Sequence, residues 1–288
     1  MSQTMEQGVM TAVMSDRDYE RLSRFIYCEC GIKMPSAKKV MLEARLRKRL
    51  RALGVTSFSK YCEYLFSKEG LENELISMID VVTTNKTDFF REPRHFDFLT
   101  AVAVPELMKL HGAGMRRTLN IWSAGCSTGE EPYTIAMVLS EFRETHPSFE
   151  FMILGTDIST KVLDRAVKAV YKMERTDTVS TEMKKKYLLR SRDRQKNLVK
   201  IGPELRPYVK FRRLNFMAED FDMREPMDLI FCRNVIIYFD RPTQEKLLNR
   251  LYHHLIPGGY LFMGHSETLS GLSTPLVSAG PMVYRKPV

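Results

Sequence analysis

The chain has 288 residues, of which 44% are hydrophobic and 27% are charged. This length and composition exclude a short peptide scaffold and a disordered chain, because there is enough apolar material for a sizeable core. The 44 Lys and Arg residues outnumber the 35 Asp and Glu residues, which gives a net charge of +9. An excess of this size favours acidic partners, and nucleic acid, anionic lipid and an acidic protein helix all fit it.

Hydropathy and cysteine usage indicate the compartment. No run approaches the roughly 20 apolar residues that span a bilayer. Residues 1–14 lack a basic start followed by an apolar block, so we expect a cytoplasmic protein without direct membrane insertion. The cysteines are five, an odd and scattered number that fits reduced thiols. No second pair completes a zinc site, and His253 and His254 have no accompanying ligands, so we expect no metal.

The first 85 residues predict an all-helical domain. Ser15 followed by Asp18 resembles a capping box at the start of a first helix. A second helix is expected at about 37–53, where leucines recur at helical spacing and Gly54 supplies the end. Its remaining face is strongly basic. Further helices are expected at 57–66 and 71–82.

Residues 86–288 predict an α/β domain. Short apolar runs alternate with helical periods after residue 118, which is typical of a doubly wound, mostly parallel sheet covered on both faces. We expect strands at 119–123, 151–156, 229–232, 260–263 and 282–285. We expect helices at 131–144, 160–169 and 243–254. The segment at about 171–214 predicts a small antiparallel β insert that includes runs at 198–201 and 208–214.

Ligands of such sheets bind beyond the carboxyl ends of the strands, and three sequence features fall there. The first is the loop Ala124-Gly-Cys-Ser-Thr-Gly-Glu-Glu131, whose glycines permit close backbone approach to a ligand. Its two glutamates disfavour a pyrophosphate but not a ligand with hydroxyls or a cationic centre. A simple glycine turn explains this loop equally well.

The other two features follow the next strands. Asp157 ends the strand at 151–156, where an acidic residue typically accepts ribose hydroxyls; a helix N-cap would also explain it, although Ser159 or Thr160 could provide that cap. The apolar run from residue 228 delivers Arg233, Asn234 and then Tyr238 beyond its end. Together these features predict an adenosine-type ligand.

The motifs TTNKTDFFRE, AGCSTGEEPY, LGTDIS, LIFCRNVIIYF and LIPGGYLFMGHSE occur in the chain. The chain from Arg17 to Tyr284 thereby resembles the chemotaxis receptor methyltransferase (CheR) family, whose fold is that of Rossmann-like methyltransferases dependent on S-adenosylmethionine (SAM). One position departs: the family's TTN-E-T pattern has Lys86 here, which puts only that side chain's role in question.

The resemblance implies methyl transfer from SAM to glutamate side chains in the cytoplasmic domains of transmembrane chemoreceptors, with S-adenosylhomocysteine as the other product. The implied cofactor contacts are Asn85, Thr87, Arg91, Glu131, Asp157, Asn215, Phe216, Arg233 and Asn234. Tyr238 and Arg91 are the candidates for orienting the reacting carboxylate. The implied receptor-binding residues on the basic helix are Arg45, Lys48, Arg49 and Arg51. In some members of the family the β insert binds a receptor C-terminal peptide as an added strand.

A glutamate with a pKa of about 4.3 is ionised at neutral pH, so this chemistry needs positioning and not a general base. We therefore interpret His265-Ser266-Glu267 as a loop and not as a catalytic trio.

Three further functions fit the basic charge or the cofactor pattern. One is a SAM-dependent RNA methyltransferase, although motifs for base chemistry are missing. The second is a SAM-sensing module without catalysis. The third is a nucleic-acid-binding protein, which would bind with steep salt dependence. We expect no nucleic-acid partner.

Overall fold

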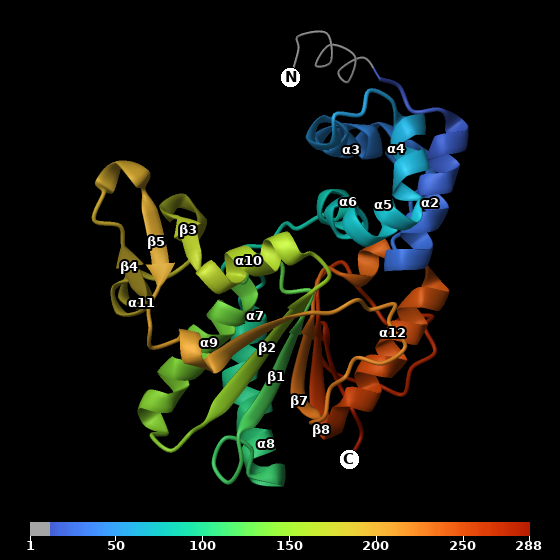
Figure 1. The fold of residues 1–288 in the computed structure, drawn as a ribbon. Coiled ribbons are helices and arrows are strands. Elements are labelled where there is room, and N and C mark those ends of the chain that lie inside the picture. Colours follow the sequence, from blue (N-terminus) through green and yellow to red (C-terminus); the bar gives the residue numbers. More distant parts are fainter. Residues whose placement is uncertain (1–11) are drawn as a thin grey trace.

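The computed structural model describes residues 12–288, which form a helical N-terminal part and a larger α/β part. Residues 1–11 lie outside the described residues; they include the start of the predicted helical domain and most of the segment searched for a signal peptide. In Figure 1 the helical part sits above one end of the large sheet, and the small insert projects beside it. Within residues 12–288, no helix has both the length and the apolarity to cross a membrane.

The N-terminal helices form where their caps and apolar faces predict them. They are α2 (Asp16–Cys30), α3 (Lys39–Leu53), α4 (Phe58–Leu65), α5 (Lys68–Asn73) and α6 (Leu75–Val82). Ser15 caps α2 by accepting from the backbone N–H of Asp18, as the sequence predicts. Buried leucines give α3 its inner face, and Gly54 ends it in the left-handed conformation. The start of the predicted helix at 37–53 is a short 3₁₀ turn, Ser36–Lys38.

The predicted helix at 71–82 is wrong in its continuity, because the chain bends at Glu74 and forms α5 and α6 instead. Glu74 is 1% exposed, and its carboxylate accepts from both Arg49 and Tyr61. The bend lets the charged side chain of Glu74, which lies in the middle of an apolar run, reach these buried partners. Helical periodicity does not show such a long-range pairing.

The large sheet has the predicted mostly parallel order, β6-β2-β1-β7-β8-β10-β9. Its strands are β1 (Leu119–Ala124), β2 (Phe151–Asp157), β6 (Val209–Arg213), β7 (Met227–Cys232), β8 (Leu255–Met263), β9 (Val277–Gly280) and β10 (Val283–Arg285). Strand β10 runs antiparallel to both of its neighbours. The structure starts β8 five residues before the predicted strand, because the chain continues to pair through the irregular register around Gly258.

Helices cover both faces of this sheet. They are α7 (Arg94–Phe98), α8 (Val104–His111), α9 (Glu130–Thr145), α10 (Thr160–Lys168) and α12 (Arg241–His254), and a π-helical turn, η2 (Leu99–Ala103), joins α7 to α8. The remaining helix, α11 (Thr181–Tyr187), packs instead on the small insert. Ile121 belongs to the core under α7, α8 and α9, whereas its neighbour Trp122 belongs to the core under α12. This alternation follows from the two-residue period of a strand.

The insert is a three-stranded antiparallel sheet, in the order β3-β5-β4. Its strands are β3 (Val170–Lys172), β4 (Leu188–Arg190) and β5 (Leu198–Ile201). The prediction that 208–214 belongs to the insert is wrong, because β6 pairs in parallel with β2 at the edge of the large sheet. Phe211 of β6 packs directly over Gly155, where a Cβ would lie 2.8 Å from its ring. Alternating apolar residues fit an edge strand of either sheet, so the sequence pattern does not distinguish the two positions.

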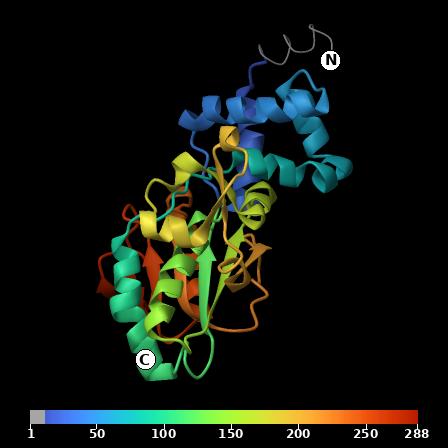
Figure 2. The same cartoon turned by 90° about the vertical axis from the view of Figure 1, so that its left-hand side faces the viewer.

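The strand directions place the site. The arrows of the parallel strands in Figure 2 point toward the helical domain, so their carboxyl ends lie beneath it. Residues 83–92, here called the linker, run from α6 to α7 across this edge. Two of its residues, Phe90 and Glu92, have positive φ values of 52° and 56°, which are uncommon for side chains of this size.

Candidate active site

A cavity of about 390 Å³ lies between the helical domain, the linker and the carboxyl ends of the parallel strands. Its volume falls within the range of about 300–1,000 Å³ that is typical of small-molecule sites. All nine residues predicted to contact the cofactor line it, and so does Tyr238. Met34, Met41 and Arg45 line it from the helical domain, so neither domain encloses the cavity alone.

The glycine loop after β1 forms one wall. Gly125 has a φ of +84°, and a Cβ there would lie 2.5 Å from the side chain of Val235, so only glycine fits without a shift. The backbone N–H groups of Gly125 and Cys126 both donate to the Thr156 carbonyl at 2.8 Å. The loop is therefore fixed to the end of β2 before any ligand binds.

Asp157 joins this loop to the following helix. Its two carboxylate oxygens accept from the backbone N–H groups of Ser127, at 2.9 Å, and Ser159, at 3.0 Å. Burial raises the pKa of Asp157, and these backbone donors oppose the rise. The side chain of Ser159 caps α10, so helix capping does not account for Asp157. Asp157 also lines the cavity, where its remaining lone pairs can accept from a ligand.

A buried charge network lies beneath the opposite wall. Arg233 follows β7 and donates to Glu131 at 3.2 Å, to Glu92 at 3.1 Å and to the carbonyl of Arg91. Glu131 also accepts from Ser123 at 2.6 Å; burial raises its pKa, and Arg233 opposes that rise. Two carboxylates thus surround one guanidinium. The Nε of Arg233 is buried and has no hydrogen-bond partner among the described residues.

The linker is held on the glycine loop. Ser127 donates to the carbonyl of Asn85 at 3.0 Å, and Arg175 donates to the carbonyl of Thr87. Arg91 donates back to the carbonyl of Lys86 at 3.3 Å. Lys86, the departure from the family pattern, is itself exposed.

Asn215 and Phe216 follow β6 and reach the same cavity. Asn215 donates to the carbonyl of Glu29 at 2.7 Å, which ties this wall to α2. The ring of Phe216 lies 6.4 Å from that of Trp122 between centroids. The residue pattern alone does not identify this pair, because it places β6 in the insert. In the structure β6 is a parallel strand at the edge of the large sheet, so both residues follow the carboxyl end of such a strand, where ligand-binding residues are expected.

Tyr238 lies in a short turn, Ile236–Tyr238, after β7. Its carbonyl accepts from the N–H of Lys33, so this turn is also attached to the helical domain. Arg45 donates to the carbonyl of Val82 and, at 2.8 Å, to the hydroxyl of Thr84. Arg45 and Tyr238 line the same cavity, and burial lowers the pKa of Arg45.

The other three predicted receptor-binding residues are not among the described residues that line the cavity. Lys48 and Arg51 are exposed. Arg49 is different, because both arms of its guanidinium donate to the buried carboxylate of Glu74, at 2.8 and 2.7 Å. This pair gives Arg49 a partner inside the protein, which Lys48 and Arg51 are not shown to have.

Glu267 is a site residue that the sequence interpretation missed. Its buried carboxylate accepts from four backbone N–H groups, those of Asn234, Val235, Ile236 and Gly264, at 2.7–2.9 Å. It therefore holds the backbone from which Asn234 and Tyr238 reach the cavity. Residues 265–267 form a loop, as expected, but the expectation did not include the backbone contacts of Glu267. Its place just after a buried strand was the available signal.

Comparisons with known proteins agree with this architecture. The family models "CheR methyltransferase, all-alpha domain" and "CheR methyltransferase, SAM binding domain" match residues 17–83 and 85–280. A chemotaxis protein methyltransferase of Borreliella burgdorferi is 40% identical over 270 residues, 93% of this chain and 94% of that protein. The protein of the same name from Escherichia coli is 38% identical over 94% of this chain and 91% of its own length.

A third relative, the chemotaxis protein methyltransferase of Salmonella typhimurium, is 37% identical over 96% of this chain and 93% of its own length. These matches extend over both the helical part and the α/β part that enclose the cavity. The chain belongs to the CheR methyltransferase family and is a methyltransferase whose cofactor is S-adenosylmethionine.

Proposed function

We propose that this chain esterifies glutamate side chains in the cytoplasmic domains of chemoreceptors, and that the cavity beneath the helical domain is where the reaction occurs. The observation that carries the proposal is that all nine family cofactor positions and the candidate orienting residue Tyr238 line this single cavity. The relatives are named as methyltransferases of chemotaxis, which supports a substrate of this kind.

The donors and acceptors of the cavity suit the parts of SAM. Asp157 accepts from the ribose hydroxyls, and Asn215 and Phe216 contact the adenine. Glu131, Arg233 and Asn234 hold the methionine end, where the two carboxylates around Arg233 favour a cationic group. Asn85, Thr87 and Arg91 close the site from the linker.

Bound SAM supplies an activated methyl group carried on a sulfonium. Once the methyl group is transferred, the sulfonium is a neutral thioether, which is the leaving group. The substrate carboxylate is already ionised at neutral pH, so the protein has no proton to remove. Its residues instead exclude water and align the carboxylate, and alignment of this kind lowers a barrier by up to roughly 7–11 kcal/mol in favourable systems. Tyr238 and Arg91 are the polar side chains that we assign to this alignment.

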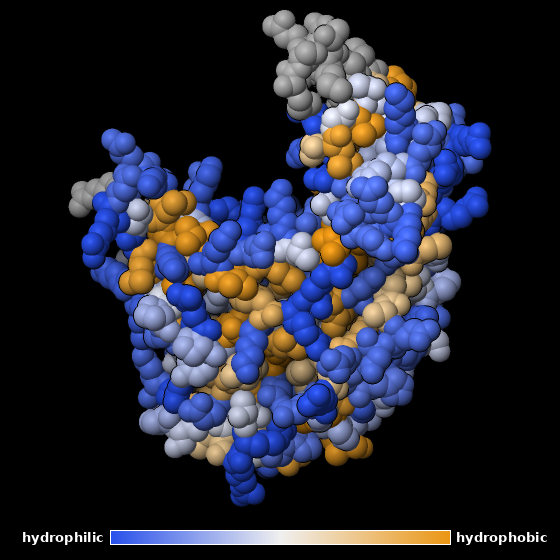
Figure 3. Space-filling model, in the orientation of Figure 1, coloured by the Kyte–Doolittle hydropathy of each residue, from blue (hydrophilic) through white to orange (hydrophobic). Residues whose placement is uncertain are grey.

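The receptor helix binds across the basic surface of α3. Arg45 lines the cavity mouth, and Lys48 and Arg51 extend the positive charge along the exposed face. Figure 3 shows that the molecular surface is hollowed between the helical domain and the insert, with hydrophobic side chains gathered below the hollow. An amphipathic, acidic helix complements both properties.

A receptor tail peptide binds at a second site, on the insert. The central strand of the insert is β5, so β3 and β4 are edge strands. An extended peptide can pair with an edge strand through backbone hydrogen bonds. This assignment to the insert rests on the family resemblance and on the presence of these edges.

The deciding experiment incubates the full chain with methyl-labelled SAM and a chemoreceptor cytoplasmic fragment, followed by mild alkali. We expect label on the receptor that is released as volatile methanol, because glutamyl methyl esters are alkali-labile. A receptor fragment in which the acidic side chains of the methylation helices are changed to alanine is the matched control. Absence of label on the intact fragment, with SAM binding retained, would refute the receptor assignment.

A further inference from the structure

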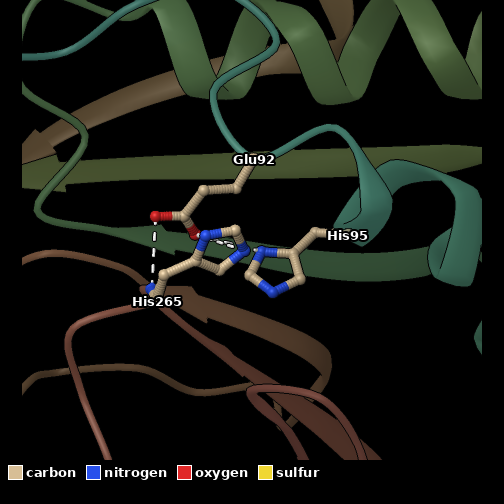
Figure 4. A group of neighbouring side chains, drawn as sticks. All are labelled: Glu92, His95 and His265. Carbon is tan, nitrogen blue, oxygen red and sulfur yellow. Dashed lines mark hydrogen bonds and ion pairs between the residues drawn. The ribbon is translucent and has the colours of Figure 1, made fainter.

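Three side chains from two distant segments of the chain converge beside the cofactor cavity. They are Glu92 of the linker, His95 of α7 and His265, which follows β8 (Figure 4). One ligand atom of each lies within 4.8 Å of the other two. The Oε2 of Glu92 is 3.5 Å from the Nδ1 of His95 and 4.0 Å from the Nε2 of His265. His95 and His265 also line a second, smaller cavity of about 230 Å³.

His95 is buried with its ring beside the carboxylate of Glu92. It is 2% exposed, and neither of its ring nitrogens forms a hydrogen bond with any described residue. A buried polar atom left in this state costs about 1–3 kcal/mol. Neutral imidazole is the form of histidine that binds metal ions.

The geometry points to a transition-metal site in which Glu92, His95 and His265 bind one Zn²⁺ ion, with water in the remaining position. Neighbouring ligands around tetrahedral zinc are about 3.3 Å apart at Zn–N distances of about 2.0–2.1 Å. The separations of 3.5 and 4.0 Å therefore need only small adjustments. The side chain of His265 is 61% exposed, which gives the ion a route from solvent.

Two contacts of Glu92 determine which metal ions this site would favour. Its Oε1 accepts from the backbone N–H of His265 at 3.2 Å, which holds the two segments together. Its Oε2 accepts from Arg233 at 3.1 Å, so the ion competes with a guanidinium for this oxygen. That competition disfavours Mg²⁺ and Ca²⁺, which depend on carboxylates, and favours an ion that imidazole binds strongly.

The same competition couples the metal to the cofactor. An ion that draws Glu92 away from Arg233 leaves the guanidinium with fewer acceptors, and Arg233 lines the cofactor cavity. We expect Zn²⁺ to weaken SAM binding. This coupling rests on the proposed role of Arg233, whereas the metal site itself does not.

Metal binding is tested with the full chain, without a histidine tag, in metal-free buffer. Titration calorimetry with ZnCl₂ should give one site per chain, and Co²⁺ should give the absorption bands of a tetrahedral ion. His265→Ala should weaken Zn²⁺ binding by about 10-fold or more. His253→Ala, which removes another exposed histidine, should not. Binding without defined stoichiometry, or equal affinities of the two variants, would overturn the site.

The coupling is tested by measuring the Kd of SAM with and without one equivalent of Zn²⁺. We expect the Kd to rise in the wild-type chain and to stay unchanged by Zn²⁺ in His265→Ala. An unchanged Kd in the wild type, despite stoichiometric zinc, would overturn the coupling. If SAM does not bind the metal-free chain at all, the proposed function fails and the calorimetric result for zinc still decides the metal site.

Discussion

Glu267 stabilises the site without lining the cavity. Its carboxylate accepts from four backbone N–H groups, and these hydrogen bonds fix residues 234–236 and Gly264 relative to one another. An ionised carboxylate suits such a set of donors, because both of its oxygens act only as acceptors.

We expect Glu267→Gln to disrupt this arrangement, because its amide group places donors against backbone donors. The free energy of unfolding should fall by about 1–3 kcal/mol, the cost of leaving buried polar groups unpaired. SAM affinity and kcat should both fall. Urea unfolding and calorimetry measure these effects, with Glu219→Gln on the surface as the control. A variant as stable as this control would contradict the assignment.

Asp157 accepts from two backbone N–H groups and also lines the cavity, so the substitution that tests its proposed ligand role must keep its shape. Asp157→Asn retains one acceptor oxygen while removing the charge. We expect the Kd of SAM to rise by about 10-fold or more, because hydrogen bonds to a charged group contribute about 1.5–3 kcal/mol. Calorimetry measures this, and circular dichroism checks the fold. Unchanged affinity would exclude the ribose role.

Tyr238 should separate catalysis from cofactor binding. Tyr238→Phe keeps the ring and removes only the hydroxyl, so we expect kcat to fall by about 10- to 100-fold if that hydroxyl orients a carboxylate. The Kd of SAM should stay within about twofold, since the Tyr238 backbone contact to Lys33 is retained. Initial-rate assays with a receptor fragment decide it, and a wild-type kcat would reduce Tyr238 to a packing residue.

At the scale of elements, α3 carries basic residues of two kinds. Lys48 and Arg51 face solvent, whereas Arg49 is bound to Glu74. The sequence of a basic helix does not show which of its residues face solvent and which are paired inside the protein. The partner of Arg49 lies 25 residues away, beyond a bend that periodicity does not predict.

This division gives opposite outcomes for neighbouring substitutions. Lys48→Glu with Arg51→Glu should raise the KM for the receptor and leave the Kd of SAM and the stability unchanged. Arg49→Ala should instead lower the free energy of unfolding by about 3 kcal/mol, because it leaves the Glu74 charge buried. Receptor kinetics and urea unfolding of both variants measure this. Loss of stability in the Lys48/Arg51 variant would show that these residues also have structural partners.

The sequence predicted the elements whose signals are local. The cap at Ser15, the leucine stripe of α3, the glycine loop and the strand leading to Arg233 all stand where the residues indicate. Features that depend on a distant partner were not predictable in this way. The placement of β6 depends on the free edge of β2, and the role of Glu267 depends on a loop some 31–33 residues away. The site residues after β6 were reached only through the family resemblance.

At the scale of the whole molecule, the cavity exists only because the linker and the helical domain cover the sheet. Val82, Asn85, Thr87 and Arg91 line it from one continuous segment, and Cys30 and Met41 line it from the helices. A ligand that enters must therefore contact both domains.

We expect bound SAM to slow amide hydrogen exchange in residues 83–92 and at the start of α3 as well as in the glycine loop, because binding stabilises the closed arrangement. Exchange measured by mass spectrometry with and without SAM tests this. The insert strands β3–β5 serve as the internal control, since the described residues that line the cavity include none of theirs. Protection confined to the α/β domain would show that the helical domain does not enclose the cofactor.

The chain has a single tryptophan, and its position gives the protein an intrinsic optical probe. Trp122 is fully buried, donates from its indole to Thr156 at 2.8 Å, and lies beside Phe216 at the wall assigned to the adenine. Tryptophan fluorescence of the chain therefore originates beside the Phe216 wall of the cavity alone. A change in emission on adding ligand reports the state of that wall, and a red shift in denaturant reports exposure of the core under α12.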